Sequence, residues 1–111
     1  MRKKFKGEEE FRKGKQLIRV KLPKGKQVIG IIIKLLGAAR MDVQCVDGRT
    51  RRCRVPGRFR RRLWLKESNL VIVEPWDIEG ETKGDVIYKY SKTQESWLRR
   101  KGYIKRLEEE F

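Results

Sequence analysis

The fold of this chain is decided by residues 41–55, which read MDVQCVDGRTRRCRV. Apolar and polar residues alternate on both sides of Asp47-Gly48, and an Asp-Gly pair between two alternating runs is a strong signal for a β-hairpin. Successive side chains of a strand point to opposite faces, so one face of the hairpin is predicted to be apolar and the other polar. The apolar face holds Met41, Val43, Cys45, Cys53 and Val55, and the polar face holds Arg40, Asp42, Gln44, Arg52 and Arg54.

Further strands are predicted on both sides of this hairpin. A β-branched run over residues 28–36 predicts a long strand with a bulge or bend at Gly30, and residues 70–74 and 84–90 predict two more. Ser91 and Gln94 have the spacing of a capping box, which predicts a helix over residues 92–101. Trp76 and Trp97 are expected to pin the fifth strand and the helix to the rest of the fold.

This element order predicts an all-β fold, a five-stranded OB-fold barrel of the S1-like type followed by a C-terminal helix. Five short antiparallel strands, with an irregular connection between the third and the fourth, are typical of that barrel. The expected organisation is a flexible basic arm over residues 1–17 without regular structure, the barrel over 18–90, the helix packed on it over 91–104, and a flexible charged tail over 105–111.

The composition excludes several function classes. The chain has 111 residues and no histidine, so it is one small domain without histidine-based catalysis or histidine metal ligands. Its two cysteines are too few for a four-ligand zinc site or a disulfide scaffold, and they are predicted to be buried cytosolic thiols. No cofactor and no metal is predicted. No apolar run approaches the roughly 20 residues of a membrane span, so we expect a cytoplasmic protein without membrane contact.

Positive charge is concentrated in part of the chain. The net charge is +15, and residues 40–66 contain ten basic residues, nine of them arginine, against two acidic ones. Residues 67–90 reverse the balance, with six acidic residues and two basic ones. A segregated basic surface attracts polyanions, and the planar guanidinium group suits phosphate oxygens and stacks on bases. The polar face of the hairpin is therefore predicted to bind nucleic acid.

The connection after the third strand supplies further candidates. Arg60-Arg61-Arg62 either continues the basic surface or forms a solvated helix surface. Phe59 and Trp64 flank this triplet, and each either stacks on an unpaired base or packs in the core.

Six groups of residues occur in a fixed order: Gly30 with Leu36-Gly37 and Arg40, Cys45-Val46-Asp47-Gly48, Arg54-Val55-Pro56-Gly57, Arg60-Arg61-Arg62-Leu63-Trp64-Leu65, Val71-Ile72-Val73 with Pro75-Trp76, and Asp85-Val86-Ile87-Tyr88-Lys89-Tyr90. Together they resemble the family of archaeal translation initiation factor 1A, homologous to the eukaryotic factor and to bacterial initiation factor one. The resemblance covers residues 17–103. Ser68-Asn69 departs from the Gly-Asp that the family usually has, which leaves the type of that turn open.

The resemblance implies a non-enzymatic factor that binds the decoding region of the small ribosomal subunit near the acceptor site. It implies that the factor stabilises initiator tRNA binding together with other initiation factors, promotes subunit dissociation and is a monomer away from the ribosome. The ending Glu108-Glu109-Glu110-Phe111 is similar to the tail with which the eukaryotic factor contacts a GTPase partner. The implied rRNA-binding residues are Arg40, Arg52, Arg54, Gly57, Arg58, Arg60, Arg61, Arg62 and Trp64.

Two other functions remain open from the residues. A general single-stranded RNA or DNA chaperone of the cold-shock type would expose aromatic side chains on the second and third strands, and residues 40–54 contain none. A small nuclease would need clustered carboxylates to hold a metal or to act as a base. The acidic residues that could gather at one rim of the barrel are Glu74, Asp77, Glu79, Glu81 and Asp85.

Overall fold

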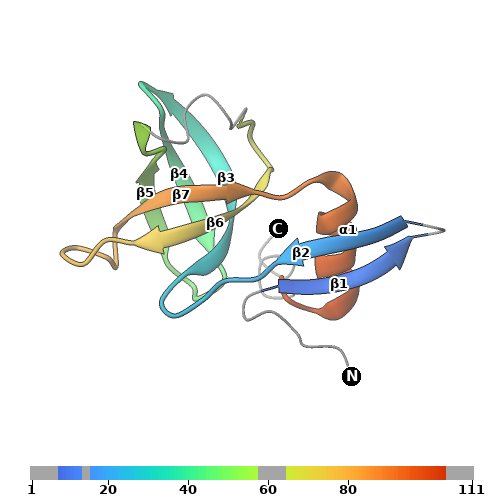
Figure 1. The fold of residues 1–111 in the computed structure, drawn as a ribbon. Helices are drawn as coiled ribbons and strands as arrows, with labels where there is room; N and C mark the ends of the chain where they lie inside the picture. The colour runs from blue at the N-terminus through green and yellow to red at the C-terminus, as the bar shows by residue number, and fades with distance from the viewer. Residues whose placement is uncertain (1–7, 14–15, 58–64, 105–111) are drawn as a thin grey trace.

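The computed structural model describes residues 8–13, 16–57 and 65–104, and Figure 1 shows a barrel with a hairpin and a helix beside it. Predictions that fall on residues 1–7, 14–15, 58–64 and 105–111 lie outside the described part. The elements are β1 (Glu8–Lys13), β2 (Gln16–Lys21), β3 (Val28–Gly37), β4 (Arg40–Cys45), β5 (Thr50–Arg54), β6 (Leu70–Pro75), β7 (Lys83–Lys89) and α1 (Lys92–Lys101). Within these residues, no helix has both the length and the apolar composition needed to cross a bilayer.

The meander of β3, β4 and β5 confirms the prediction made from residues 41–55. β4 pairs antiparallel with β3 on one side and with β5 on the other. The five residues of the predicted apolar face are at most 4% exposed and lie in one core cluster with residues of β3, β6 and β7. Burying a side chain of this size stabilises the folded state by about 1.5–3 kcal/mol, so the alternating pattern fixes which face turns inward.

The barrel closes through β6 and β7. β6 pairs antiparallel with β3 and with β7, and β7 runs parallel to β5, which gives the closed order β3-β4-β5-β7-β6. This five-stranded closed barrel confirms the predicted OB-fold. The expectation of antiparallel strands throughout is wrong at the β5–β7 pair. A closed ring with an odd number of strands must contain at least one parallel pair of neighbours.

The register of β3 against β4 is irregular at two places, and neither of them is Gly30. One extra residue is inserted between Ile32 and Lys34 and another between Leu35 and Gly37, whereas Gly30 pairs in regular register with the strands on both sides. Gly30 meets a different requirement, because an added Cβ atom would lie 2.4 Å from Cγ1 of Val43 inside the barrel. Both a bulge and a close approach favour glycine, so the sequence pattern could not distinguish them.

Replacing Gly30 with alanine is expected to lower the free energy of unfolding by about 1–3 kcal/mol, since the core must shift to admit the new methyl group. Urea denaturation measures the loss. Gly57→Ala is the matched control, because nothing lies within 4 Å of a Cβ atom at that position. Equal losses in the two variants would contradict this account.

The N-terminal segment differs from the prediction of an arm without regular structure. β1 and β2 form a two-stranded antiparallel sheet, in which Glu8 is in register with Lys21 and Glu10 with Arg19. Two short and highly charged strands give little signal in the sequence. An isolated hairpin is also marginally stable in water, so its formation depends on contacts with the rest of the fold.

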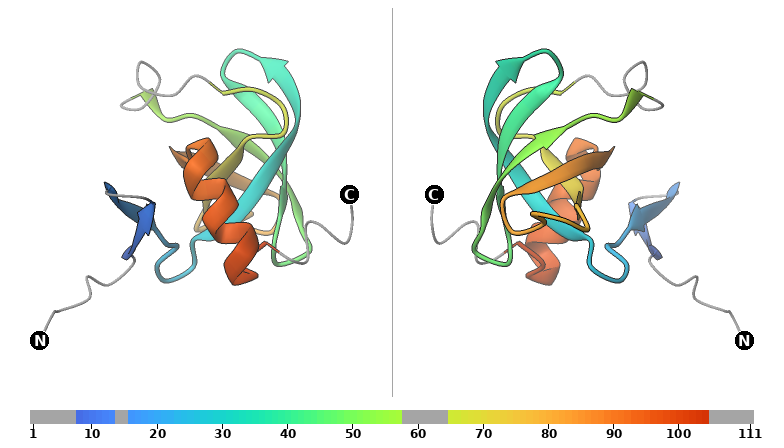
Figure 2. Two further views of the ribbon diagram at one scale, coloured as in Figure 1. Left: turned by 90° about the vertical axis from the view of Figure 1, so that its right-hand side faces the viewer. Right: turned by 90° about the vertical axis from the view of Figure 1, so that its left-hand side faces the viewer.

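Those contacts come from helix α1 and from Tyr90, the residue that follows β7. Figures 1 and 2 show the hairpin beside α1 and apart from the barrel strands. The side-chain amide of Gln94 donates to the carbonyl oxygen of Arg19 at 2.8 Å, and the Tyr90 hydroxyl donates to the carbonyl oxygen of Lys21. Val20 between them is fully buried. The helix therefore supplies the surface on which β2 is held.

Helix α1 begins and ends as predicted. The Ser91 hydroxyl accepts a hydrogen bond from the backbone N–H of Gln94 at 3.2 Å, and the Gln94 side-chain oxygen accepts one from the backbone N–H of Ser91 at 2.8 Å. Gly102 ends the helix with φ +80°, in the left-handed region that favours glycine. Trp97 is 5% exposed and lies in a core cluster with residues of β2, β3 and β6, which confirms its predicted role as an anchor.

The turn before β6 contains the departure from the Gly-Asp pair. Ser68 has φ +73°, in the region that favours glycine. The Asn69 side-chain oxygen accepts a hydrogen bond from the backbone N–H of Lys66 at 2.8 Å. An aspartate oxygen would accept the same bond, so the turn keeps its hydrogen bonding and holds Ser68 in a left-handed conformation.

Candidate nucleic-acid interface

Charged residues cross the outer surface of β4, β5 and β7 in two neighbouring rows. Residues two apart in a strand share a face, so both rows lie on the same side of the sheet. One row consists of Arg40, Arg54 and Asp85, and the other of Asp42, Arg52 and Lys83, each in register from strand to strand. We call the surface formed by Arg40, Arg52 and Arg54 the arginine face. All three arginines are exposed, so the structure brings these predicted site residues together.

Arg52 is held by a carboxylate of the neighbouring strand. Its Nε donates to Oδ1 of Asp42 at 2.8 Å, and this hydrogen bond raises the pKa of Arg52 above its usual value. The Arg52 side chain is nevertheless 56% exposed. A guanidinium group has five N–H donors, and this contact uses one of them. Arg52 is thus oriented by the protein and keeps donors with which it can bind a phosphate.

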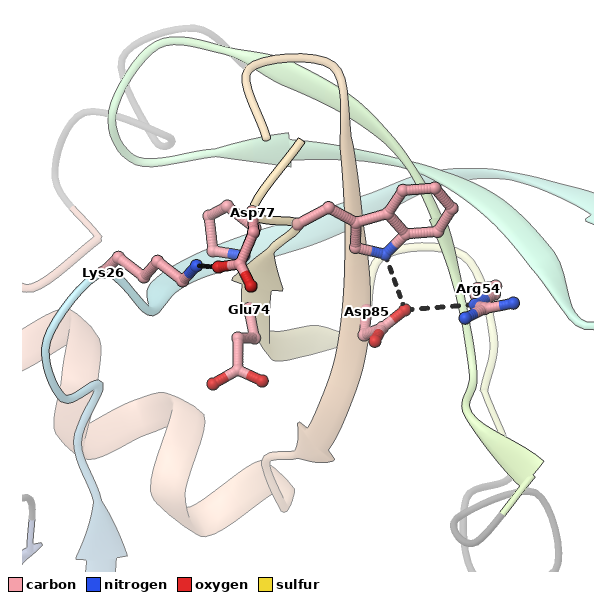
Figure 3. Close-up of a pocket in the computed structure, with 7 residues that line it drawn as sticks. Lys26, Arg54, Glu74, Asp77 and Asp85 are labelled. Carbon is pink, nitrogen blue, oxygen red and sulfur yellow. Dashed lines mark hydrogen bonds and ion pairs between the residues drawn. The ribbon is translucent and has the colours of Figure 1, made fainter. Parts of the chain in front are cut away.

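Arg54 is held by two residues of the barrel. Its Nε lies 3.3 Å from Oδ1 of Asp85, and the indole N–H of Trp76 donates to the same oxygen at 2.9 Å (Figure 3). The guanidinium carbon also lies 5.1 Å from the centre of the Trp76 ring, within the range of a cation–π contact. The contact between Trp76 and β7 agrees with the expectation that this tryptophan pins the fifth strand.

A cavity of about 430 Å³ adjoins this group. It is lined by residues of both charges, namely Lys26, Arg54, Glu74, Pro75, Trp76, Asp77 and Asp85. The Lys26 ammonium forms an ion pair with Asp77, and its hydrogen bond lowers the pKa of that carboxyl below the usual range (Figure 3). Two of its three acidic residues already form ion pairs with the two basic ones, Asp77 with Lys26 and Asp85 with Arg54.

The acidic residues considered for a nuclease are engaged individually by nearby polar or basic groups. The ion pairs are Asp77 with Lys26, Glu79 with Lys83, Glu81 with Arg49, and Asp85 with Arg54, while Glu74 lies 3.4 Å from the side-chain amide of Gln27. Within residues 8–13, 16–57 and 65–104, no three side chains of the types that bind metals gather in one place. The described structure therefore gives no support to a metal-dependent nuclease.

Arg51 is the charged residue whose role the sequence analysis missed. Its side chain donates to both carboxylate oxygens of Asp47, at 3.1 and 2.8 Å, and its Nε donates to the carbonyl oxygen of Gly80 at 2.6 Å. Arg51 is only 4% exposed and ties the β4–β5 turn to the β6–β7 loop. Arg51 lies two residues before Cys53 and so on the same face of the strand as the apolar residues. This position was the signal in the sequence that could have indicated a buried arginine.

The ionisation of Asp47 is coupled to this contact. Burial alone would raise the pKa of Asp47, but the hydrogen bonds from Arg51 and from the backbone N–H of Arg49 outweigh burial and lower it. A carboxyl with a lowered pKa in the folded state stabilises that state above its unfolded pKa, which is near 4. The stabilisation is lost as the pH falls through the lowered value.

Asp47→Asn is therefore expected to be less stable than the wild type at pH 7, with a difference that shrinks on acidification. The difference in free energy of unfolding should be constant between about pH 7 and 5 and should narrow below about pH 4, because asparagine does not ionise. Urea denaturation at several pH values measures it. A difference that stays constant down to about pH 2 would contradict the coupling.

Cys45 and Cys53 are buried, as predicted. Burial raises the pKa of both thiols above the usual value, and for Cys45 it does so despite the nearby Arg51. Thiols with raised pKa are poor nucleophiles near neutral pH, so the two cysteines belong to the core.

The remaining predicted site residues lie beyond the described strands. Gly57 is exposed shortly after the end of β5. Arg58, Arg60, Arg61, Arg62 and Trp64, together with Phe59, lie outside the described residues.

Comparison with known proteins identifies the family. The model for translation initiation factor 1A / IF-1 matches residues 13–111. The chain is 50% identical to translation initiation factor 1A of Pyrococcus abyssi over 91 residues, which cover 82% of this chain and 80% of the relative. It is 49% identical to the factor of Thermococcus kodakarensis over 94 residues, with the same two coverages.

The solution structure of a bacterial relative, translation initiation factor IF-1 from a Wolbachia endosymbiont of Brugia malayi, is also similar. It has 28% sequence identity and a TM-score of 0.48, and the match covers 62% of this chain and 82% of that one. The family match extends over both the barrel and the helix and includes all three residues of the arginine face. The chain belongs to the translation initiation factor 1A / IF-1 family.

Proposed function

We propose that this protein binds the rRNA of the small ribosomal subunit through its arginine face. Its family consists of initiation factors that act on the ribosome in the cytoplasm and are not enzymes. The observation that supports the proposal most directly is the grouping of Arg40, Arg52 and Arg54 on one exposed face of a closed barrel. A closed barrel holds its strands rigidly, so these cations meet a phosphate backbone with little loss of freedom.

The binding surface that we propose extends beyond the described strands. Gly57 follows β5 and leads into Arg58 and the triplet Arg60-Arg61-Arg62. Each arginine that neutralises a phosphate releases counterions from the RNA, so affinity should fall steeply with salt. We include Trp64 as a residue that stacks on an unpaired base.

The more specific part of the proposal concerns the place and the consequence of binding. We propose that the protein occupies the decoding region near the acceptor site, that it favours initiator tRNA binding together with other factors, and that it promotes dissociation of the subunits. The acidic and apolar ending, residues 108–111, is proposed to contact a GTPase factor. Family membership supports these statements, and each needs its own assay.

A general single-stranded RNA chaperone is the competing function. Such proteins bind through aromatic side chains exposed on the sheet, and residues 40–54 contain no aromatic residue. The ring of Trp76, at the edge of the arginine face, is in contact with Arg54 and Lys83, with distances to the ring centre of 5.1 and 5.6 Å. These contacts reduce the ring surface that is open to a base.

Chemical footprinting of small-subunit rRNA with and without the protein tests the proposal. We expect protection confined to the decoding region, and an affinity for small subunits well above that for random single-stranded RNA at the same salt concentration. Equal affinity for both would favour the chaperone. An absence of binding to small subunits at low ionic strength would refute the proposal.

A further inference from the structure

We propose that Asp85 and Trp76 are positioning residues that fix the guanidinium group of Arg54 for contact with an RNA phosphate. The inference rests on the proposed function and adds to it two residues that bind no RNA themselves. The arrangement is a triad in which one carboxylate oxygen of Asp85 accepts hydrogen bonds from both Trp76 and Arg54 (Figure 3).

The triad joins three separate parts of the barrel. Arg54 is the last residue of β5, Asp85 lies in register with it on β7, and Trp76 directly follows β6. Trp76 holds Arg54 in two ways, because its N–H orients the accepting carboxylate and its ring centre lies 5.1 Å from the guanidinium carbon. Asp85 is partly shielded, with 23% of its side chain exposed, whereas the Arg54 side chain is 56% exposed. The Asp85 carboxylate is thus less exposed to solvent than the Arg54 side chain that it holds.

The chemistry of arginine favours such a support. A long, flexible side chain loses much rotamer freedom when it binds, and a side chain that is already held loses less. The contact with Asp85 engages Nε, so Nη1 and Nη2 remain the atoms with which Arg54 can bind a phosphate in a forked geometry. Asp42 engages Arg52 through Nε in the same way.

The negative charge of Asp85 allows a positioning role to be distinguished from a purely electrostatic one. A carboxylate beside a phosphate-binding surface repels the RNA, so removing Asp85 should strengthen binding if only its charge mattered. Positioning predicts the opposite, because without the acceptor Arg54 must be ordered at the moment of binding. Asp85→Asn and Asp85→Ala change the charge equally, but only asparagine keeps an oxygen that can accept from Arg54 and Trp76.

The experiment measures the affinity of the full chain for small ribosomal subunits at a fixed salt concentration. Asp85→Ala is expected to bind about 3- to 10-fold more weakly than the wild type, and Asp85→Asn to bind at least as tightly. Glu81→Gln is the control for charge. Glu81 lies in the β6–β7 loop, pairs with Arg49 and has a side chain that is 77% exposed. It should not weaken binding.

A double-mutant cycle with Arg54→Ala excludes a merely structural role. If Asp85 acts through Arg54, Asp85→Ala causes no further loss of affinity in a chain that already lacks Arg54. Trp76→Phe, which keeps a ring but removes the N–H donor, is a second route should Asp85→Ala fail to fold. We expect a smaller loss of about 2- to 3-fold from it, and none in the Arg54→Ala background.

Three outcomes would overturn the inference. One is tighter binding by Asp85→Ala and Glu81→Gln to the same extent, and another is an equal loss from Asp85→Ala with and without Arg54. In both cases the wild type still binds small subunits and the proposed function stands. A wild-type protein that does not bind small subunits would overturn the proposed function, and this inference with it.

Discussion

Replacing Arg52 and Arg54 together with alanine is expected to weaken binding to small ribosomal subunits by about 10- to 100-fold at roughly 0.1 M salt. Both side chains lie on the arginine face, and each is oriented through its Nε by an aspartate of a neighbouring strand. Losing a hydrogen bond that involves a charged group costs about 1.5–3 kcal/mol of binding free energy. The loss of two such contacts would exceed this range if nothing compensated for it. The expected loss of affinity is smaller because the neighbouring basic residues still attract the RNA.

The dependence on salt supplies a second measurement of the same variant. The slope of the logarithm of affinity against the logarithm of salt concentration should decrease by about one for each phosphate contact removed. The matched control is Arg49→Ala combined with Arg99→Ala. It also removes two arginines whose side chains are about half exposed, but neither belongs to the arginine face. Equal losses of affinity in the two double variants would show that only the total charge matters.

Trp97→Ala is expected to lower the free energy of unfolding by about 3–5 kcal/mol. The Trp97 ring stacks on Tyr103, with 5.6 Å between ring centres, and packs with Val20 and Leu98 in the core beside the barrel. A domain of this size has a total stability of roughly 5–15 kcal/mol, so the variant would lose a large part of it. Urea denaturation followed by circular dichroism measures the change.

The same variant should loosen the N-terminal hairpin. β2 is held by its contacts with the helix, so the backbone N–H groups of Arg19 and Val20 should exchange with solvent faster in Trp97→Ala. Trp97→Phe keeps an aromatic ring and should lose clearly less stability. A loss below about 1 kcal/mol from Trp97→Ala would show that the helix does not depend on this anchor.

The predicted elements agree with the structure wherever the hydrophobic pattern alone specifies the outcome. The alternation around Asp47-Gly48 placed Arg40, Arg52 and Arg54 outward because one face of a barrel sheet must be buried. Ser91, Gln94 and Gly102 marked both ends of the helix because capping is a local interaction. Patterns of this kind depend on the chain nearby, so the sequence contains all the information they need.

The errors in the prediction have a different origin. The hairpin of β1 and β2 depends on a surface that α1 supplies from about 75 residues later in the chain, as the bond from Gln94 to Arg19 shows. The irregularities in β3, between Ile32 and Lys34 and between Leu35 and Gly37, depend on how this strand pairs with β4. The parallel pairing of β5 and β7 follows from closure of a ring with an odd number of strands. A local pattern contains none of these conditions.

By itself the sequence determined the barrel, the helix and the outward direction of Arg40, Arg52 and Arg54, because hydrophobic periodicity and capping act over a few residues. Only the tertiary structure decided which carboxylates hold Arg52 and Arg54. Asp85 and Trp76 reach Arg54 because the barrel closes and places β5, β7 and the end of β6 side by side. Arg51 is likewise satisfied only because closure brings the carbonyl group of Gly80 within hydrogen-bond distance.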